Sequence, residues 1–125
     1  MVIVIDFDGV CVEEEYPYIG RPLPNAVKVI NKLYDQGHTI IIWSCREGES
    51  LEEAIEALDL HGFKYHHINQ NCPERKKRFG GIDSRKVGGD VYIDDKCLPY
   101  LLKGIDWLEI DKMLTFVLNK SVHTT

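Results

Sequence analysis

With 125 residues, the chain has about the length of one domain and can bury roughly two thirds of the surface that its unfolded form exposes. Its 44% apolar and 28% charged residues are ordinary for a globular protein in water. The formal net charge of −5 argues against a dedicated nucleic-acid binder, which usually carries a basic excess on one face. We therefore expect a single domain over residues 1–125 that binds no nucleic acid.

No apolar run approaches the roughly 20 residues that span a bilayer, so we expect no membrane role. Met1 leads directly into an apolar segment without a basic leader or a cleavage pattern, which predicts a cytoplasmic protein. The four cysteines are widely separated and form no Cys-x-x-Cys pair, which indicates reduced and mostly structural thiols. The oligomeric state stays open.

Strand-like apolar segments alternate with helical segments along the chain. Strands are predicted at residues 2–6, 39–43, 65–69 and 91–94. Helices are predicted from Pro24 to a stop at Gly37, from a capping box at Ser50 and Glu53 to a stop at Gly62, and over residues 107–119. Residues 9–22 are interpreted as an irregular flap whose tyrosines could cover a site. This alternation predicts an α/β fold with a central parallel sheet covered on both faces.

Two groups of residues are interpreted as having no catalytic role. His66 and His67 are adjacent in a predicted strand and so point to opposite faces, which argues against a shared metal ion. The remaining histidines, His38, His61 and His123, are also expected to be structural. The basic run at residues 75–78 is interpreted as a solvated loop or short helix, with a rim that attracts an anionic substrate as the second interpretation.

Acidic pairs close the first and last predicted strands. Asp6 and Asp8 follow the first strand, and Asp94 and Asp95 follow the last. Because ligands of parallel α/β sheets bind outside the carboxyl ends of the strands, we expect these acids to meet at one edge, together with Ser44. Two carboxylates roughly 4 Å apart repel by about 4 kcal/mol at an effective dielectric of about 20, so four together need a cation or protons. Oxygen ligands alone favour Mg²⁺.

These segments resemble the motifs of the haloacid dehalogenase superfamily of phosphotransfer enzymes, over residues 1–95. Residues 6–10, Asp-Phe-Asp-Gly-Val, are similar to the first motif, Asp-x-Asp-Gly-[Thr/Val] after an apolar strand. Residues 40–44 resemble the second motif, a strand ending in Ser or Thr. Residues 91–95 resemble the fourth, an apolar strand ending in paired acids. The order of the motifs along the chain agrees with that of the superfamily.

The third motif of the superfamily is a single Lys or Arg. Residues 86–95 look like the Lys-x-x-x-Asp-x-Tyr-Ile-Asp-Asp run of short, capless members, which makes Lys86 the candidate. Residues 87–89, Val-Gly-Gly, stand where a Pro often follows the Lys. For that reason the alternatives Lys76, Lys77 and Arg85 stay open.

The resemblance implies a three-layer, Rossmann-like fold and a Mg²⁺-dependent phosphatase that works through an aspartyl-phosphate. Asp6 would be the nucleophile, and Asp8 would donate and accept the proton as general acid and base. Ser44 and Lys86 would bind the phosphoryl oxygens. Arg46, two residues after Ser44, is a further candidate for contact with the substrate, with a surface salt bridge as the alternative.

The same resemblance assigns the metal ligands. Mg²⁺ would be held by Asp6, the Asp8 carbonyl group and Asp94, with Asp95 in support. Gly9 would let the backbone turn directly after the strand, so that both acids of the first motif face one centre.

The spacing of the motifs leaves no room for a cap domain. Only about a dozen residues separate Gly9 from Pro22, and the interval from Ser44 to Lys86 is filled by one helix, one strand and a basic loop. Capless relatives have an open site, so the expected substrate is a sugar phosphate, a nucleotide or a larger phosphoester. Two alternatives are a phospho-acceptor signalling module, although receivers of that class place adjacent acids first, and a binding protein that has lost catalysis.

Overall fold

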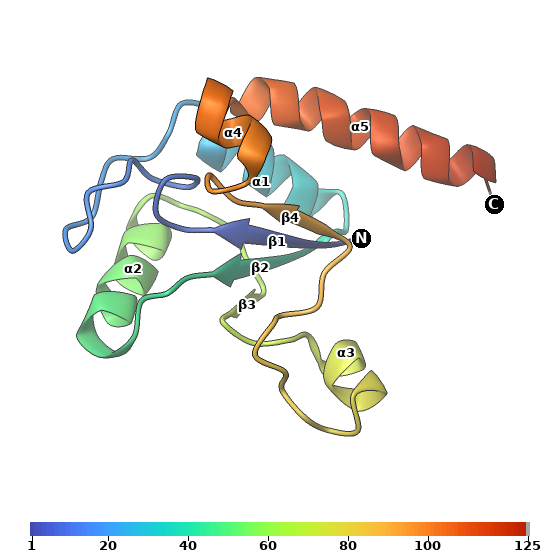
Figure 1. The fold of residues 1–125 in the computed structure, drawn as a ribbon, viewed down its shortest axis with the longest axis horizontal. Coiled ribbons are helices and arrows are strands. Elements are labelled where there is room, and N and C mark those ends of the chain that lie inside the picture. The colour runs from blue at the N-terminus through green and yellow to red at the C-terminus, as the bar shows by residue number, and fades with distance from the viewer. Residues whose placement is uncertain (125) are drawn as a thin grey trace.

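Four parallel strands form the centre of the molecule, in the order β3-β2-β1-β4 (Figure 1). The computed structural model describes residues 1–124, and side chains as far as residue 119. The strands are β1 (Val2–Asp6), β2 (Thr39–Trp43), β3 (His67–Ile68) and β4 (Val91–Ile93). The helices are α1 (Ala26–Asp35), α2 (Gly48–Leu60), α3 (Pro73–Arg78), α4 (Leu98–Lys103) and α5 (Trp107–Thr124). The predicted α/β fold with a parallel sheet is confirmed, and it is consistent with a three-layer, Rossmann-like architecture.

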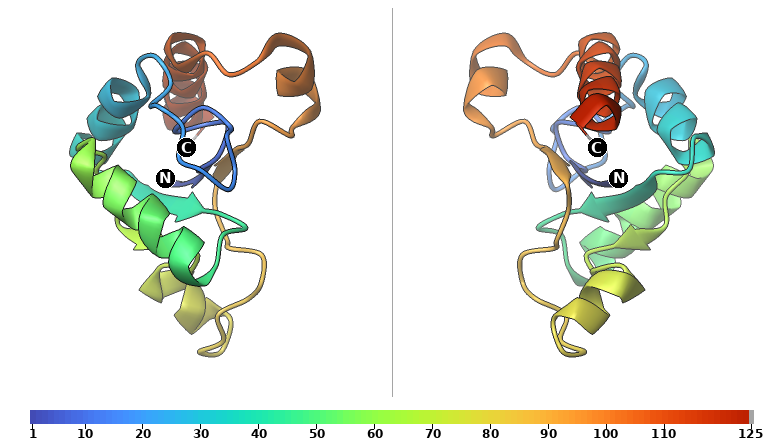
Figure 2. Two further views of the ribbon diagram at one scale, coloured as in Figure 1. Left: turned by 90° about the vertical axis from the view of Figure 1, so that its left-hand side faces the viewer. Right: turned by 90° about the vertical axis from the view of Figure 1, so that its right-hand side faces the viewer.

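The two faces of the sheet are covered in different ways. Ile3 and Ile5 point to the face where α1, α2 and α5 supply the main apolar core. Val4 points to the opposite face, where it meets Cys72 and Val87 from the connection between β3 and β4. Helix α3 belongs to this connection and lies on the opposite side of the sheet from α1 and α5 (Figure 2). The second face is therefore thinly covered, which leaves space beside the end of β1.

The order of the strands reverses beside β1. The chain runs from β1 to β2 and β3 on one side, then crosses the sheet to place β4 on the other side of β1. Ile5 is in register with both Ile42 and Ile93, so the three strands end at the same level. Asp6 and Asp94 consequently emerge next to each other at the carboxyl edge, where ligands of open α/β sheets bind.

Among the predicted boundaries that differ from the structure, the start of α2 and the extent of β3 have clear physical reasons. Helix α2 begins at Gly48, before the predicted capping box, and its N-cap residue makes no side-chain capping bond. The hydroxyl of Ser50 instead donates to the Glu47 carbonyl group at 2.8 Å, so the capping box is wrong. Strand β3 is shorter than predicted because the amide of Ile40 donates to the His66 ring at 3.0 Å instead of to a strand carbonyl group. His66 also stacks on Tyr34, which agrees with a structural role.

The remaining predictions to compare with the structure concern the helices and one histidine. Helix α4 was not expected from the sequence, whereas the short helix predicted within the basic run is present as α3. Trp107 is buried at the start of α5 and donates from Nε1 to the Val10 carbonyl group at 2.8 Å, which ties α5 to the loop after β1. None of the described helices has both the length and the apolar character needed to cross a membrane. The side chain of His123 lies outside the described residues.

Candidate functional site

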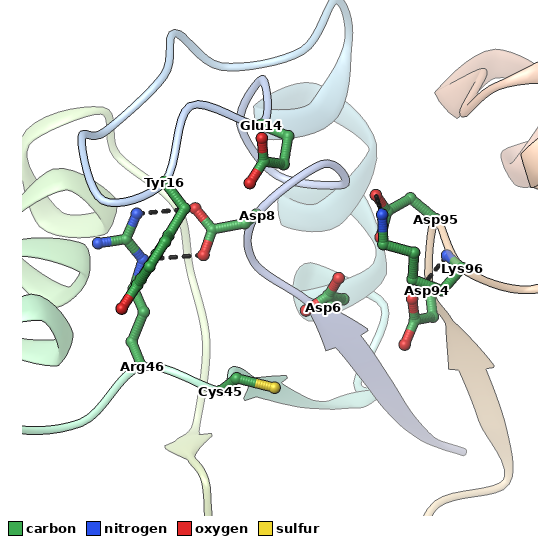
Figure 3. Close-up of a pocket in the computed structure, with 9 residues that line it drawn as sticks. All are labelled: Asp6, Asp8, Glu14, Tyr16, Cys45, Arg46, Asp94, Asp95 and Lys96. Carbon is green, nitrogen blue, oxygen red and sulfur yellow. Dashed lines mark hydrogen bonds and ion pairs between the residues drawn. The ribbon is translucent and has the colours of Figure 1, made fainter.

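Three carboxylates gather at the switch point between β1 and β4. Asp6, Asp94 and Asp95 each place one oxygen within 4.8 Å of the others, and we call this set the acidic cluster (Figure 3). Asp94 accepts a hydrogen bond from the Lys96 backbone amide at 2.8 Å. Oδ1 of Asp95 is buried and has no hydrogen-bond partner within the described part of the chain. Such an atom is costly to bury unless a cation or proton satisfies it.

The surroundings of Asp6 raise its pKa from 3.8 to about 8. Burial is the largest cause, followed by the hydrogen bond of protonated Asp6 with Asp95 and by the negative charges of Asp94 and Asp95; the Phe7 backbone amide acts in the opposite direction. Without a cation, the cluster therefore retains a proton near neutral pH. Oxygen-only donors with an unsatisfied carboxylate oxygen suit a hard divalent ion such as Mg²⁺.

Gly9 allows the loop after β1 to pass directly beside the cluster. Its φ is +86°, a conformation that favours glycine, and a Cβ atom placed there would lie 2.2 Å from Oδ2 of Asp95. The positive φ agrees with the predicted turn at Gly9, but the two acids of the first motif do not face one centre, because Asp8 is directed to Arg46. Any side chain at this position would push into the acidic cluster.

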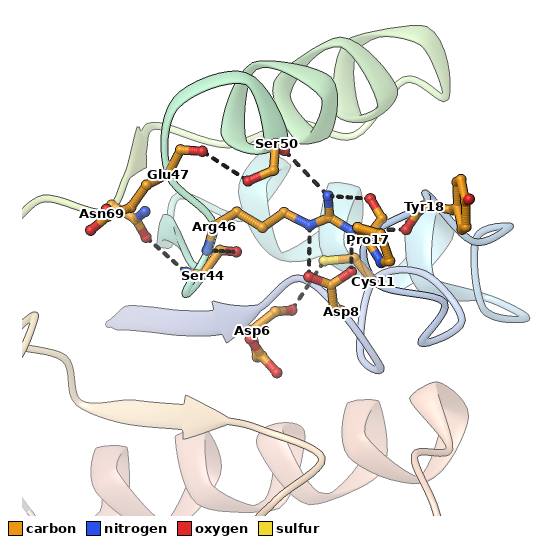
Figure 4. Close-up of polar contacts among 10 residues, drawn as sticks. All are labelled: Asp6, Asp8, Cys11, Pro17, Tyr18, Ser44, Arg46, Glu47, Ser50 and Asn69. Atoms are coloured by element: carbon orange, nitrogen blue, oxygen red, sulfur yellow. Dashed lines mark hydrogen bonds and ion pairs between the residues drawn. The ribbon is translucent and has the colours of Figure 1, made fainter.

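The carboxylate of Asp8 points away from the cluster and toward Arg46 (Figures 3 and 4). Nε and Nη2 of Arg46 donate to the two carboxylate oxygens of Asp8, each at 2.8 Å. The Arg46 side chain is 1% exposed and that of Asp8 17% exposed. Asp8 is thus held by a bidentate and largely buried ion pair, which is the strongest geometry for such a contact.

The guanidinium group of Arg46 is directed to the flap as well as to Asp8, instead of being free to contact a substrate. Its remaining guanidinium hydrogens donate to the carbonyl groups of Pro17, Tyr18 and Ser50 at 2.9 to 3.3 Å. All five N–H groups are therefore used within the protein, and none is left for a substrate phosphate. The alternative of a salt bridge agrees with the structure, although the pair with Asp8 is largely buried rather than on the surface.

Ser44 lies where the sequence places it, directly after β2. Its Oγ accepts a hydrogen bond from the Arg46 backbone amide at 3.0 Å, so its own proton is available to a ligand. The Ser44 backbone amide donates to the Asn69 side chain at 2.7 Å. Asn69 follows β3 with a φ of +54°, a conformation that Asn tolerates better than most residues. The sequence gives no specific signal for this supporting role of Asn69.

Asp6 lines two neighbouring pockets. The larger, of about 440 Å³, lies beside Asp8 and Arg46 and reaches the flap. Its remaining lining residues are Asp6, Glu14, Tyr16, Cys45, Asp94, Asp95 and Lys96. A smaller pocket of about 210 Å³ contains Trp43, Ser44 and Cys45 together with Asp6 and Asp94. The nucleophile candidate is therefore open to one large and one small compartment.

Lys86 lies on the side of the smaller compartment. It lines a third pocket of about 160 Å³ that also contains Asp6, Asp94 and Tyr92. Its Nζ lies 5.2 Å from the centre of the Tyr92 ring, a cation–π contact. Among the alternatives, Lys76 is engaged with Gln70 at 3.0 Å and with Asp83 at 3.7 Å. The geometry favours Lys86 over Lys76 as the third-motif candidate, because Lys86 lines a pocket with Asp6.

Tyr16 belongs to the flap whose tyrosines the sequence predicts as a cover, and it lines the large pocket although 57% exposed. Three other residues of this pocket were missed by the sequence predictions. Lys96 directly follows the paired acids, a position that could have identified it. Glu14 and Cys45 carry no motif and are found only from the fold.

The fold and the site together define an α/β protein with an acidic centre at its topological switch point. A conserved protein of Bacteroides thetaiotaomicron has a similar solved structure, with a TM-score of 0.78. The two sequences are 40% identical over 92% of this chain and 89% of the other. The chain therefore belongs to the same family as that conserved protein. No family model matches the chain, and no curated protein matches it.

Proposed function

We propose that the protein is a Mg²⁺-dependent phosphomonoester hydrolase that acts through an aspartyl-phosphate on Asp6. The observation that carries this proposal is the arrangement around Asp6. Two further carboxylates lie within 4.8 Å of it in the acidic cluster, and it lines two neighbouring pockets. A nucleophile for phosphoryl transfer needs this combination of charge neutralisation and positioning.

The acidic cluster offers the ligands for the metal. Asp6, Asp94 and Asp95 would contribute carboxylate oxygens, and the resemblance adds the Asp8 carbonyl group. A bound Mg²⁺ ion would supply positive charge that keeps Asp6 ionised and offsets the charge of the phosphoryl group. The high pKa of Asp6 supports this assignment, because the cluster needs a positive charge before Asp6 can act as a nucleophile at neutral pH.

In the first step, a carboxylate oxygen of Asp6 attacks phosphorus and the ester P–O bond breaks. Asp8, which must first take up a proton from solvent while it is paired with Arg46, gives that proton to the leaving oxygen. In the second step, water attacks phosphorus while Asp8 takes a proton from it, and the bond between phosphorus and Asp6 breaks to release inorganic phosphate. The free hydroxyl proton of Ser44 and the ammonium group of Lys86 would bind the non-bridging oxygens.

The two compartments suggest how the substrate is oriented. The phosphoryl group fits the smaller side, which contains Ser44 and adjoins Lys86. The leaving alcohol fits the larger pocket, which Asp8 and the flap line. Asp8 then lies on the side of the oxygen that needs its proton.

A phosphatase screen tests this function. Purified protein with Mg²⁺ is assayed on an aryl phosphate and on a panel of sugar phosphates, nucleotides and phosphopeptides, in parallel with Asp6→Asn. We expect turnover of at least one ester and a loss of about 10⁴-fold or more in Asp6→Asn, as for removal of a nucleophile. The control is Asp35→Asn, an exposed residue of α1 that pairs with Lys64, which should keep full activity.

The screen also separates the alternatives. A phospho-acceptor module would accumulate a stable phosphoryl adduct without releasing phosphate at a useful rate. A binding protein without catalysis would turn over no ester in the panel. Activity that survives in Asp6→Asn would refute Asp6 as the nucleophile.

A further inference from the structure

We propose that Arg46 is a positioning residue that both orients Asp8 and holds residues 13–22 of the flap in place. This inference rests on the proposed hydrolase, in which Asp8 moves the proton. It assigns to Arg46 a role distinct from contact with the substrate. The argument depends on how completely the protein surrounds this one side chain.

The guanidinium group of Arg46 is saturated by protein contacts. Two of its N–H groups hold both oxygens of Asp8, two more reach the carbonyl groups of Pro17 and Tyr18 in the flap, and the last reaches Ser50 in α2. Figure 4 shows these bonds spreading from one side chain to three segments. Removal of Arg46 would therefore leave both a catalytic carboxylate and the flap without their partner.

Aromatic rings lie close to the same guanidinium group. Its central carbon is 5.6 Å from the centre of the Phe7 ring and 5.0 Å from that of the Tyr16 ring. Phe7 is fully buried beside Asp6 and Asp8 in sequence, whereas Tyr16 belongs to the flap. The planar cation thus bridges the fixed end of β1 and the exposed flap. A lysine cannot reproduce both the bidentate pair with Asp8 and the contacts with the two aromatic rings.

The tip of the flap is attached by the packing of Ile19 against the core and by hydrogen bonds from Arg46. The flap is closed at its base by the Glu13 amide, which donates to the Arg21 carbonyl group at 2.8 Å. Within the described part of the chain, the hydrogen bonds that join residues 14–19 to anything outside the flap all come from Arg46. The tip also supplies Glu14 and Tyr16 to the large pocket. Arg46 therefore controls the wall of that pocket as well as the direction of Asp8.

A consequence follows for proton transfer. With both oxygens held by Arg46, Asp8 is fixed near Asp6 yet kept apart from the acidic cluster. Without that anchor, Asp8 is free to rotate, and the distance over which it must deliver a proton is no longer set. The loss should then be greatest for substrates whose leaving group needs a proton.

Arg46→Lys tests the positioning role through two substrates that differ in the leaving group. For an alkyl phosphate, whose leaving oxygen must be protonated, we expect kcat/KM to fall about 100-fold or more, within the usual range for general acid–base catalysis. For an aryl phosphate with an acidic phenol we expect a fall of less than about tenfold, because that group leaves without a proton. Asp8→Asn should show the same selectivity. An equal loss on both substrates would overturn the assignment.

A double-variant cycle shows whether Arg46 acts through Asp8. If it does, Arg46→Lys should lower alkyl phosphate turnover by no more than about threefold in the Asp8→Asn background, because the effect is already lost there. Multiplicative losses would contradict the proposal. The matched control is Arg75→Lys, whose guanidinium pairs with Asp90 at the opposite end of β4 from the acidic cluster and which should leave turnover unchanged.

Amide hydrogen exchange of residues 13–22 gives a measurement that does not depend on activity. Arg46→Lys should raise the exchange rate of this segment at least several-fold, while Arg75→Lys leaves it as in the wild type. Unchanged exchange in Arg46→Lys would show that Arg46 does not seat the flap. If the wild type hydrolyses neither substrate, the proposed function fails, and with it the proton-transfer half of the inference, whereas the exchange result still decides the seating of the flap.

Discussion

Two acidic regions meet at the end of β1, and they are stabilised in opposite ways. In the acidic cluster, carboxylates face one another, Asp6 has a raised pKa, and one oxygen of Asp95 has no partner among the described residues. Asp8 is only two residues away from Asp6, yet the protein itself supplies its positive charge through Arg46. In the first region, of the residues that the structure describes, only Lys96 pairs with a carboxylate, with its Nζ 3.9 Å from Asp95, whereas both oxygens of Asp8 are paired. The difference is consistent with the proposed assignment of metal binding and proton transfer to separate acids.

The largest effect that would sharpen this comparison concerns Lys86, the lysine that lines a small pocket beside Asp6. Lys86→Ala should lower kcat/KM for a phosphomonoester by about 100-fold, because an aligned positive charge stabilises the transferring group. Lys77→Ala, a second exposed lysine of the β3–β4 connection, should have almost no effect. Steady-state kinetics on both variants also decides between the candidates for the third motif. A large loss in Lys77→Ala with none in Lys86→Ala would reverse the assignment.

Gly9 lies beside Asp95, so substitution there should disturb the acidic cluster while leaving the pair between Asp8 and Arg46 in place. Gly9→Ala combines strain at positive φ with a contact at 2.2 Å to Asp95, and we expect a loss of about 3 kcal/mol in the free energy of unfolding. Gly37→Ala has a similar φ of +92° with nothing within 4 Å of the added atom, and should lose only about 1 kcal/mol. Urea denaturation measures both. Equal losses would mean that the close contact with Asp95 does not contribute to the loss of stability.

Removal of one ligand should weaken the affinity of the cluster for Mg²⁺ without affecting the pair between Asp8 and Arg46. Asp94→Asn should raise the Kd for Mg²⁺ at least about tenfold, because a charged oxygen donor is lost. Isothermal titration calorimetry with Mg²⁺ alone measures this, with Asp35→Asn as the control. Unaltered binding in Asp94→Asn would contradict the assignment of the cluster as the metal site.

The smallest effect is a pH dependence of stability in the metal-free protein. Because the pKa of Asp6 is higher in the folded state than its usual 3.8, the folded state holds more protons between 3.8 and about 8, and the free energy of unfolding falls as pH rises through that window. Asp6→Asn removes the titrating group, so the Tm of the variant should rise by several degrees relative to that of the wild type as pH increases across the window. Thermal melts with a chelator present measure this. Parallel curves would show that Asp6 is not perturbed.

Local patterns in the sequence predicted the parts of the fold and site that depend on single segments. The buried run of β1, with Asp6 at its end, and that of β2, with Ser44 after it, are clear from composition alone. The pairing between Asp8 and Arg46 joins residues 38 positions apart and could not be read from spacing. Sequence proximity of Arg46 to Ser44 suggested a substrate contact, whereas the fold turns the guanidinium toward the flap. Contacts between segments distant in sequence, rather than the local sequence, set the direction of the Arg46 side chain.

The short elements were predicted less well for a similar reason. Strand β3 is limited to two residues because the His66 ring takes a backbone donor of β2, a contact between segments 26 residues apart. The start of α2 depends on the route of the chain after Arg46 rather than on a capping side chain. Neither cause leaves a signal in local periodicity.

The most direct test of Asp6 as nucleophile is a search for its phosphoryl adduct. Asp8→Asn is incubated with Mg²⁺ and an aryl phosphate, whose leaving group needs no proton, then quenched in acid and analysed by tandem mass spectrometry of the peptide that contains residue 6. We expect the phosphoryl group on Asp6, in a larger fraction than in the wild type, because the variant lacks the base that activates water. Turnover by the wild type with no adduct on Asp6 in either protein, or with the adduct on another residue, would contradict the account.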